Sequence, residues 1–158
     1  MKLAGQTFTV VPEEIVPIVR GDKEYFLILR GGADIQIFES LVPDPKPPRK
    51  TLPGNIQVEE TNDPKYKEAV ATKNQLRLAW MIIKALEATP DLTWETVDLN
   101  DPSTWLNYQQ ELLAAGMTIK EVNRVIDATL AAYLLDDKKV DEAKKRFLAS
   151  RHQQQESQ

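Results

Sequence analysis

Apolar positions in the first third of the chain follow the spacing of β-strands. Residues 15–19 and 25–29 are rich in β-branched and aromatic side chains, and a Gly-containing turn at 21–24 lies between them. This pattern predicts a hairpin with a loop of about four residues. Pro12 and Pro17 interrupt the first strand. Because proline offers no N–H to a β-ladder, they indicate an edge strand or a bulge.

Two short segments after the hairpin give weaker indications of their secondary structure. Gly31 and Gly32 predict a turn that ends the second strand. Ile35, Ile37 and Phe38 then form a short apolar segment, and their periodicity fits a strand and a single helical turn equally well.

The stretch 43–54 contains five prolines with three basic residues between them. Each proline fixes its own φ and disfavours helix in the residue before it, so an extended, polyproline-like chain is predicted. Its composition favours a semi-rigid linker. The alternative is a docking peptide for an aromatic groove on a partner.

From residue 62 the pattern becomes helical. Asp63-Pro64 is an N-cap followed by a first-turn proline, and it starts a predicted helix that runs to about Ala88. Asp101-Pro102 repeats this start signal for a helix that reaches Ala115, and Gly116 lies at the position of a left-handed C-terminal cap. The apolar residues predicted to be buried in these two helices are Leu76, Ala79, Trp80, Ile83, Leu86, Trp105, Leu112 and Leu113. Charged residues, Lys73 among them, make the first half of the long helix the more exposed half.

Two more helices are predicted before residue 150. Thr118 and Glu121 have the spacing of a capping box that starts one helix, and Asp136 is the predicted N-cap of the other. The apolar faces of these helices are Val122, Val125, Ile126, Thr129, Leu130 and Tyr133 in the first, and Val140, Ala143, Phe147 and Leu148 in the second.

These elements predict an α+β protein. We expect an N-terminal β-hairpin or meander arm at 1–42, a Pro-rich linker at 43–61, a four-helix α domain at 62–150 and a disordered polar tail at 151–158. The short turns between the later helices favour a small bundle, to which Trp80 and Ile83 of the long helix contribute.

Composition narrows the class of function. The 158 residues include no cysteine and carry a net charge of −4, so neither a disulfide framework nor a cysteine-based metal site is expected. The acidic balance gives no electrostatic reason to expect nucleic acid as a partner. The longest apolar run, 78–83, is too short for a membrane span, and the N-terminus shows no signal-peptide pattern. A cytoplasmic protein is therefore expected.

Motifs for catalysis, cofactors and metals are not found. The single histidine, His152, lies in the polar tail, where an imidazole lacks the support that a base or ligand needs. The glycines at 31–32 lack the remaining residues of a phosphate-binding loop. The acids at 136–142 alternate with lysines and match no known metal-binding loop. We therefore expect a protein that is not an enzyme and has no catalytic residue, cofactor or metal.

Aromatic side chains offer the best candidates for partner binding. Tryptophan fills cores well, and it is also enriched at interface hot spots. Trp105 and Tyr108 lie three residues apart on one helical face and rank first as anchors, followed by Trp80, Met81 and Trp94. Core packing is the simpler interpretation of each tryptophan.

The order of several short motifs resembles a family of tail assembly chaperones of long-tailed, siphovirus-like bacteriophages. The motifs are the Val-Arg-Gly-Asp turn at 19–22, the segment 38–48, Asp63-Pro64-Lys65-Tyr66, the helix at 77–86, the stretch 92–98, Asp101-Pro102-Ser103-Thr104-Trp105 and the segment 143–148. The resemblance covers most of the chain.

The resemblance implies a non-catalytic protein that binds the tape measure protein and helps the tail tube protein to polymerise around it. Such a protein acts in the host cytoplasm and is not expected in the mature virion. A homo-oligomer is also expected, in which the arm and the tether would let subunits join by strand addition at the proline-interrupted edge. The alternatives are a minor structural tail or connector protein of the virion, a small bacterial adaptor domain and, least favoured, an enzyme with carboxylate chemistry.

Overall fold

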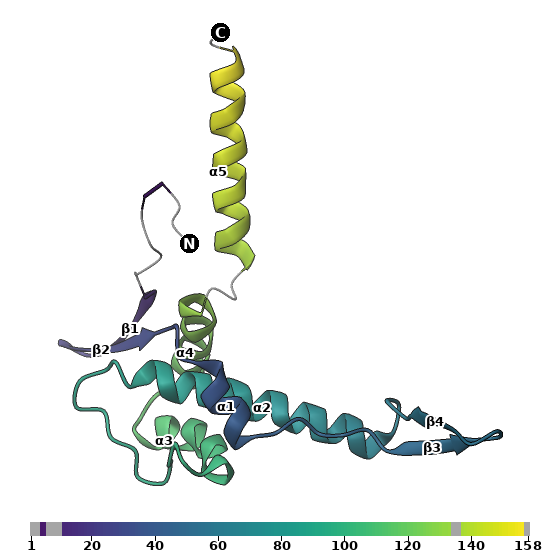
Figure 1. The fold of residues 1–158 in the computed structure, drawn as a ribbon. Helices are drawn as coiled ribbons and strands as arrows, with labels where there is room; N and C mark the ends of the chain where they lie inside the picture. The colour runs from purple at the N-terminus through teal and green to yellow at the C-terminus, as the bar shows by residue number, and fades with distance from the viewer. Residues whose placement is uncertain (1–3, 6–10, 134–136, 157–158) are drawn as a thin grey trace.

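A computed structural model of the chain describes residues 4–5, 11–133 and 137–156, and it confirms the α+β class (Figure 1). Two small antiparallel hairpins and a set of helices make up the fold. In chain order the elements are β1 (Glu13–Arg20), β2 (Lys23–Arg30), α1 (Ile35–Leu41), β3 (Arg49–Leu52), β4 (Ile56–Glu59), α2 (Pro64–Leu86), the 3-10 helix η1 (Pro102–Asn107), α3 (Tyr108–Ala114), α4 (Ile119–Ala132) and α5 (Asp137–Glu156).

The first hairpin is confirmed, but its loop is shorter than expected. The strands pair from Glu13 opposite Arg30 to Arg20 opposite Lys23, so only Gly21 and Asp22 form the turn. Gly21 has a φ of +64°, which glycine adopts without the steric cost that a Cβ brings. The predicted four-residue loop was wrong because Lys23 and Glu24, although polar, extend the second strand.

Pro17 lies within β1 without breaking the ladder, and the hydrogen bonds of β2 show why. The N–H of Ile28 donates to the Thr89 hydroxyl at 2.8 Å, and that hydroxyl donates back to the Ile28 carbonyl at 2.9 Å. Ile28 therefore does not exchange these bonds with Ile15, its partner in the ladder. Antiparallel pairs alternate between bonded and non-bonded types, so Pro17, two residues from Ile15, also lies in a non-bonded pair. Its missing N–H falls on the outer edge and interrupts no ladder bond.

The short apolar segment after the hairpin is a helix. Asp34 caps α1 by accepting a hydrogen bond from the N–H of Gln36 at 3.0 Å. Phe38 of this helix is fully buried between two tryptophans, with ring centroids 5.8 Å from Trp80 and 5.9 Å from Trp105. Periodicity could not decide between helix and strand here, because the deciding contacts come from α2 and η1.

The region expected to be a separate arm shares one core with the helices. Val16 of β1, Leu29 of β2 and Phe38 of α1 belong to the same buried cluster as Trp80 and Ile83 of α2. Strand β1 packs against α4, and β2 packs against α2. The expected burial of Trp80 and Ile83 is confirmed. Residues 1–42 were interpreted as an arm because a linker appeared to follow, but the described part of that region is built into the body.

The Pro-rich linker is only partly extended, and the prediction for 43–61 was wrong over its second half. Strands β3 and β4 pair from Arg49 opposite Glu59 to Leu52 opposite Ile56 and form a second hairpin. Before it, the proline-containing stretch runs beside the first half of α2 (Figure 1).

Lys73 holds this stretch in place and is buried, although an exposed position was predicted. Its ammonium group donates to Glu39 and to Asp44, at 2.5 Å each. It also lies over the Phe38 ring, 5.6 Å from the centroid. The hydrogen bond from Lys73 lowers the pKa of the Glu39 carboxyl and that of the Asp44 carboxyl.

The predicted helix at 101–115 is two elements, η1 followed by α3. The start at Asp101-Pro102 is confirmed, since Asp101 accepts from the N–H of Ser103 at 3.0 Å. The end at Gly116 is also confirmed: its φ is +94°, and the N–H groups of Gly116 and Met117 donate to carbonyls of the last turn, as in a Schellman cap. Leu112 is buried as expected, whereas Leu113 is exposed.

The capping box of α4 is confirmed, with the Thr118 hydroxyl and the Glu121 carboxylate each accepting from the other residue's N–H. The last helix departs from expectation in two ways. Its face Val140, Phe147 and Leu148 is exposed rather than packed in the bundle. The helix also continues to Glu156, so residues 151–156 are not the disordered tail that was predicted. The predicted cap Asp136 lies outside the described residues.

Gly31 makes a close contact that the sequence did not indicate. A Cβ built at this position would lie 1.9 Å from the carbonyl oxygen of Ala132, at the end of α4. Overpacking of this kind costs about 1–3 kcal/mol, because a neighbour must shift. At Gly21 a Cβ would meet nothing within 4 Å.

We predict that Gly31→Ala lowers the free energy of unfolding by about 3 kcal/mol, since the obstacle is backbone and cannot rotate away. Gly21→Ala serves as the matched control. Its loss should be about 1 kcal/mol, from the left-handed conformation alone. Urea denaturation of the two variants measures both values, and equal losses would show that the Gly31 contact is not tight.

Candidate functional site

An apolar groove lies between the tip of the β1–β2 hairpin, the end of α3 and the irregular segment 87–101 that joins α2 to η1. We call this segment the connector. It has a volume of about 450 Å³ and is lined by Ile18, Arg20, Tyr25, Leu27, Leu92, Thr93, Trp94, Glu111, Leu112, Ala115 and Met117. Most of these side chains are apolar. The volume falls in the range of about 300–1,000 Å³ that is usual for binding sites.

The hairpin wall follows from the two-residue alternation of strands. Ile18 lies opposite Tyr25, and Val16 lies opposite Leu27, so these four side chains share one face of the hairpin. Val16 is buried against the body, whereas Tyr25 is 54% exposed. The inner face of the hairpin thus continues beyond the helices that cover its base, and this overhang forms the wall of the groove.

The connector wall is held by the Glu111 carboxylate. Glu111 accepts hydrogen bonds from the N–H groups of Glu95, Thr96 and Val97, at 2.9, 2.7 and 3.1 Å, and from the Thr96 hydroxyl at 2.5 Å. Burial opposes ionisation of Glu111, but the bonds from Thr96 and from the three N–H groups outweigh it and lower the pKa. This carboxylate therefore orders the irregular segment that carries Trp94.

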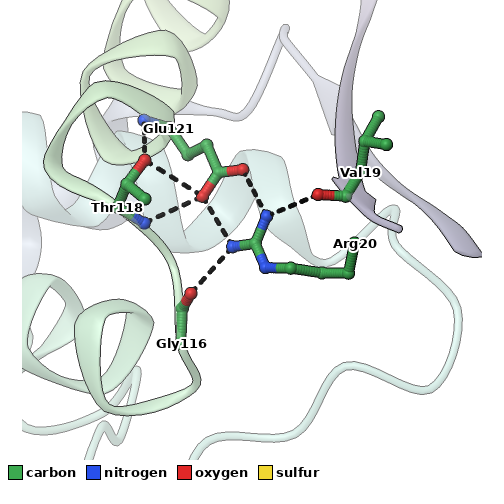
Figure 2. Close-up of polar contacts among 5 residues, drawn as sticks. All are labelled: Val19, Arg20, Gly116, Thr118 and Glu121. Carbon is green, nitrogen blue, oxygen red and sulfur yellow. Dashed lines mark hydrogen bonds and ion pairs between the residues drawn. The ribbon is translucent and has the colours of Figure 1, made fainter.

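Arg20 fastens the tip of the hairpin to the helices (Figure 2). Its guanidinium donates to both oxygens of Glu121 at 2.8 Å, a bidentate geometry, and to the carbonyl of Gly116 at 2.7 Å. Glu121 in turn accepts from the N–H of Thr118 at 2.8 Å. The Glu121 carboxylate thus takes part in the N-cap of α4 and also holds the end of β1. Its bidentate pairing with Arg20 fixes the orientation of the two groups as well as their distance.

The same contacts stabilise the ionised form of Glu121. The hydrogen bond from Arg20, followed by the bond from the Thr118 N–H, lowers the pKa of Glu121 from 4.5 to about 2. The pKa of Arg20 is raised by the same hydrogen bond. Glu121 therefore stays charged at every pH at which the protein would normally act.

The groove offers apolar surface rather than reactive groups. Its two charged residues, Arg20 and Glu111, are both engaged in structural hydrogen bonds. Among residues 4–5, 11–133 and 137–156, no cluster of acidic or histidine side chains is placed to hold a metal ion. Within the same ranges, the helices are too short or too polar to cross a membrane.

Four of the five predicted partner anchors are buried in the body. Trp80 and Trp105 are at most 1% exposed, and Met81 and Tyr108 are 6% and 7% exposed. Trp105 also donates its indole N–H to the carbonyl of Asp98 at 2.9 Å. Their prediction as accessible anchors was wrong, and the simpler interpretation as core residues holds for the two tryptophans among them.

Trp94 is the predicted anchor that lines the groove, and it is only partly buried. Sequence reasoning missed Tyr25 and Ile18 as its neighbours. The alternation in the hairpin placed Ile18 and Tyr25 on one face, but no local signal placed that face next to the connector.

We predict that the Arg20–Glu121 pair makes stability fall as the pH drops from about 4.5 to about 2. A carboxyl whose pKa is lower in the folded state contributes stability that is present above its unfolded pKa and is lost on acidification. Urea denaturation at a series of pH values should therefore show that acidification lowers the free energy of unfolding less in Glu121→Gln than in the parent protein. The variant should also be less stable at neutral pH.

Glu68→Gln, which alters an exposed carboxylate on α2, is the control. Its free energy of unfolding should fall on acidification as much as that of the parent protein. Glu39, Asp44 and Glu111 also have lowered pKa values, so each protein keeps some dependence on pH. Only the difference between variant and parent reports on Glu121. Parallel curves for Glu121→Gln and the parent would contradict the prediction.

Comparison of the chain with protein-family models, curated protein sequences and solved structures found no match. The resemblance to tail assembly chaperones therefore rests on the short sequence motifs alone.

Proposed function

We propose that this protein is a non-enzymatic tail assembly chaperone that binds the tape measure protein and assists polymerisation of the tail tube protein. The observation that carries the proposal is the apolar groove, whose rim holds the partly exposed Trp94 and Tyr25. The motif order of the sequence supplies the identity of the client.

The chemistry of the groove suits an apolar helical segment. An amphipathic helix binds such a groove through side chains at positions i, i+3 or i+4, and i+7. Leu92, Trp94 and Leu112 offer apolar contact, and Met117 adds an unbranched side chain that adapts to different shapes. A client with many similar apolar repeats requires this tolerance more than it requires one exact fit.

The electrostatics are compatible with a holding function. A net charge of −4 keeps the protein dispersed while part of its apolar surface remains accessible. The protein would act in the host cytoplasm and would leave before the virion is complete. A minor structural tail or connector protein is the second candidate, and mass spectrometry of purified particles separates the two, since a chaperone should be missing from them. For a bacterial adaptor domain, the coding sequence would lie outside a phage tail gene cluster.

We predict that co-expression with a tape measure protein keeps that protein in the soluble fraction, and that the two proteins co-purify. Trp94→Asp should reduce the recovered client by about tenfold or more, because it places a charge where an apolar side chain must dock. Tyr25→Asp should act in the same direction. Quantitative gel analysis after affinity purification measures the effect.

Val58→Asp is the matched control, since Val58 is an exposed apolar strand residue on the other hairpin, 42% exposed. It should leave client recovery unchanged. Circular dichroism confirms that each variant is folded. Full recovery of client with both groove variants would refute the groove as the client site.

A further inference from the structure

The β1–β2 hairpin has a second apolar face that the body does not cover. Ile15, Pro17 and Val19 alternate with the buried side of β1, and Phe26 lies opposite Pro17 on β2. Ile15 is 62%, Val19 55% and Phe26 53% exposed. Strands that are apolar on both faces are typical of sheets that are covered on both sides. We call this surface the outer hairpin face.

Helix α5 carries an apolar stripe that is equally open. Val140, Phe147 and Leu148 fall on one side of the helix and are 53%, 60% and 45% exposed. Figure 1 shows α5 leading away from the body. A helix of 20 residues whose apolar stripe is exposed is marginal in water, because helices in proteins are stabilised mainly by packing of an amphipathic face.

The outer hairpin face and the α5 stripe match in length. From Val140 to Leu148 the helix rises about 12 Å, at 1.5 Å for each residue. From Ile15 to Val19 the strand rises about 13 Å, at roughly 3.3 Å for each residue. The stripe therefore covers the outer hairpin face from one end to the other.

The two surfaces also match in charge. The range Asp137–Glu156 contains six Lys or Arg and four Asp or Glu residues, so α5 carries +2, whereas the whole chain carries −4 and the remainder therefore −6. On the stripe side of α5, Lys144 lies between Val140 and Phe147, and Arg151 lies one turn beyond Phe147. The tip of the hairpin presents Asp22 and Glu24, so Arg151 is the cation that these two acids match. This places Phe147 near Val19 and Val140 near Ile15, with α5 parallel to β1.

We propose that two copies of this chain form a symmetric dimer in which α5 of each copy packs on the outer hairpin face of the other. Both surfaces occur on every chain, so a two-fold axis makes the contact twice. The client groove is on the opposite face of the hairpin, so the dimer can be tested without any client and does not rest on the proposed function.

The absence of cysteine from the sequence allows a direct test by disulfide formation. Val19→Cys in one preparation and Leu148→Cys in another, tagged preparation should form a mixed disulfide when they are combined under mild oxidation. Such a bond requires Cα atoms within about 7 Å. Ala149→Cys, on the opposite side of α5, and Val58→Cys, on the second hairpin, are the matched controls and should cross-link at background level only.

Sedimentation of the full chain provides the second measurement. The parent protein should be a dimer at micromolar concentration, and Phe147→Asp or Val19→Asp should each raise the dissociation constant by about tenfold or more. Both substitutions are at exposed positions, so the fold should remain intact by circular dichroism. Val58→Asp should leave the dissociation constant unchanged.

Three outcomes would overturn the proposal. The first is a monomeric parent protein, and the second is a mixed disulfide no more abundant than those of the controls. The third is a disulfide formed within a single chain by the double variant Val19→Cys/Leu148→Cys at high dilution, which would mean that α5 folds back on its own hairpin.

Discussion

A two-stranded hairpin is not stable alone in water, and the organisation of this protein follows from the way in which β1–β2 meets that constraint. Its inner face, with Val16 and Leu29, is buried against α4 and α2. The bidentate Arg20–Glu121 contact then fixes the far end of the hairpin. The strands extend past the helices that cover their base. The uncovered part of the inner face therefore becomes one wall of the groove.

Polar side chains determine where the irregular segments lie. Glu111 gathers three consecutive N–H groups of the connector, and Lys73 ties the proline-containing stretch to α2. Lys73 is buried and Glu111 accepts backbone hydrogen bonds, so each group fixes the position of the segment that it contacts. A carboxylate that accepts several backbone bonds holds a loop in one conformation, and in this way the connector presents Trp94 to the groove.

The capping signals that start and end the helices were interpreted correctly, whereas most contacts between distant residues were not predicted. The starts at Asp63, Asp101 and Thr118 and the end at Gly116 depend on neighbours within a few residues, so the sequence contains the necessary information. The burial of Phe38 depends on tryptophans more than 40 residues away, and that of Lys73 depends on two acids about 30 residues before it. The same limit explains the anchors: Trp94 could not be distinguished from Trp105 until the packing of η1 was known.

The hairpin also links the two surfaces for which partners are proposed. Alternation along each strand sends Ile18 and Tyr25 to the groove and sends Val19 and Phe26 to the outer face, so the same two strands serve both. The inner face is packed on helices α2 and α4, whereas the outer face is exposed. If a partner on one face orders the strands that the other partner contacts, the two binding events are coupled, and such a coupling is reciprocal. Dimerisation through the outer face would therefore strengthen client binding in the groove, and client binding would strengthen the dimer to the same degree.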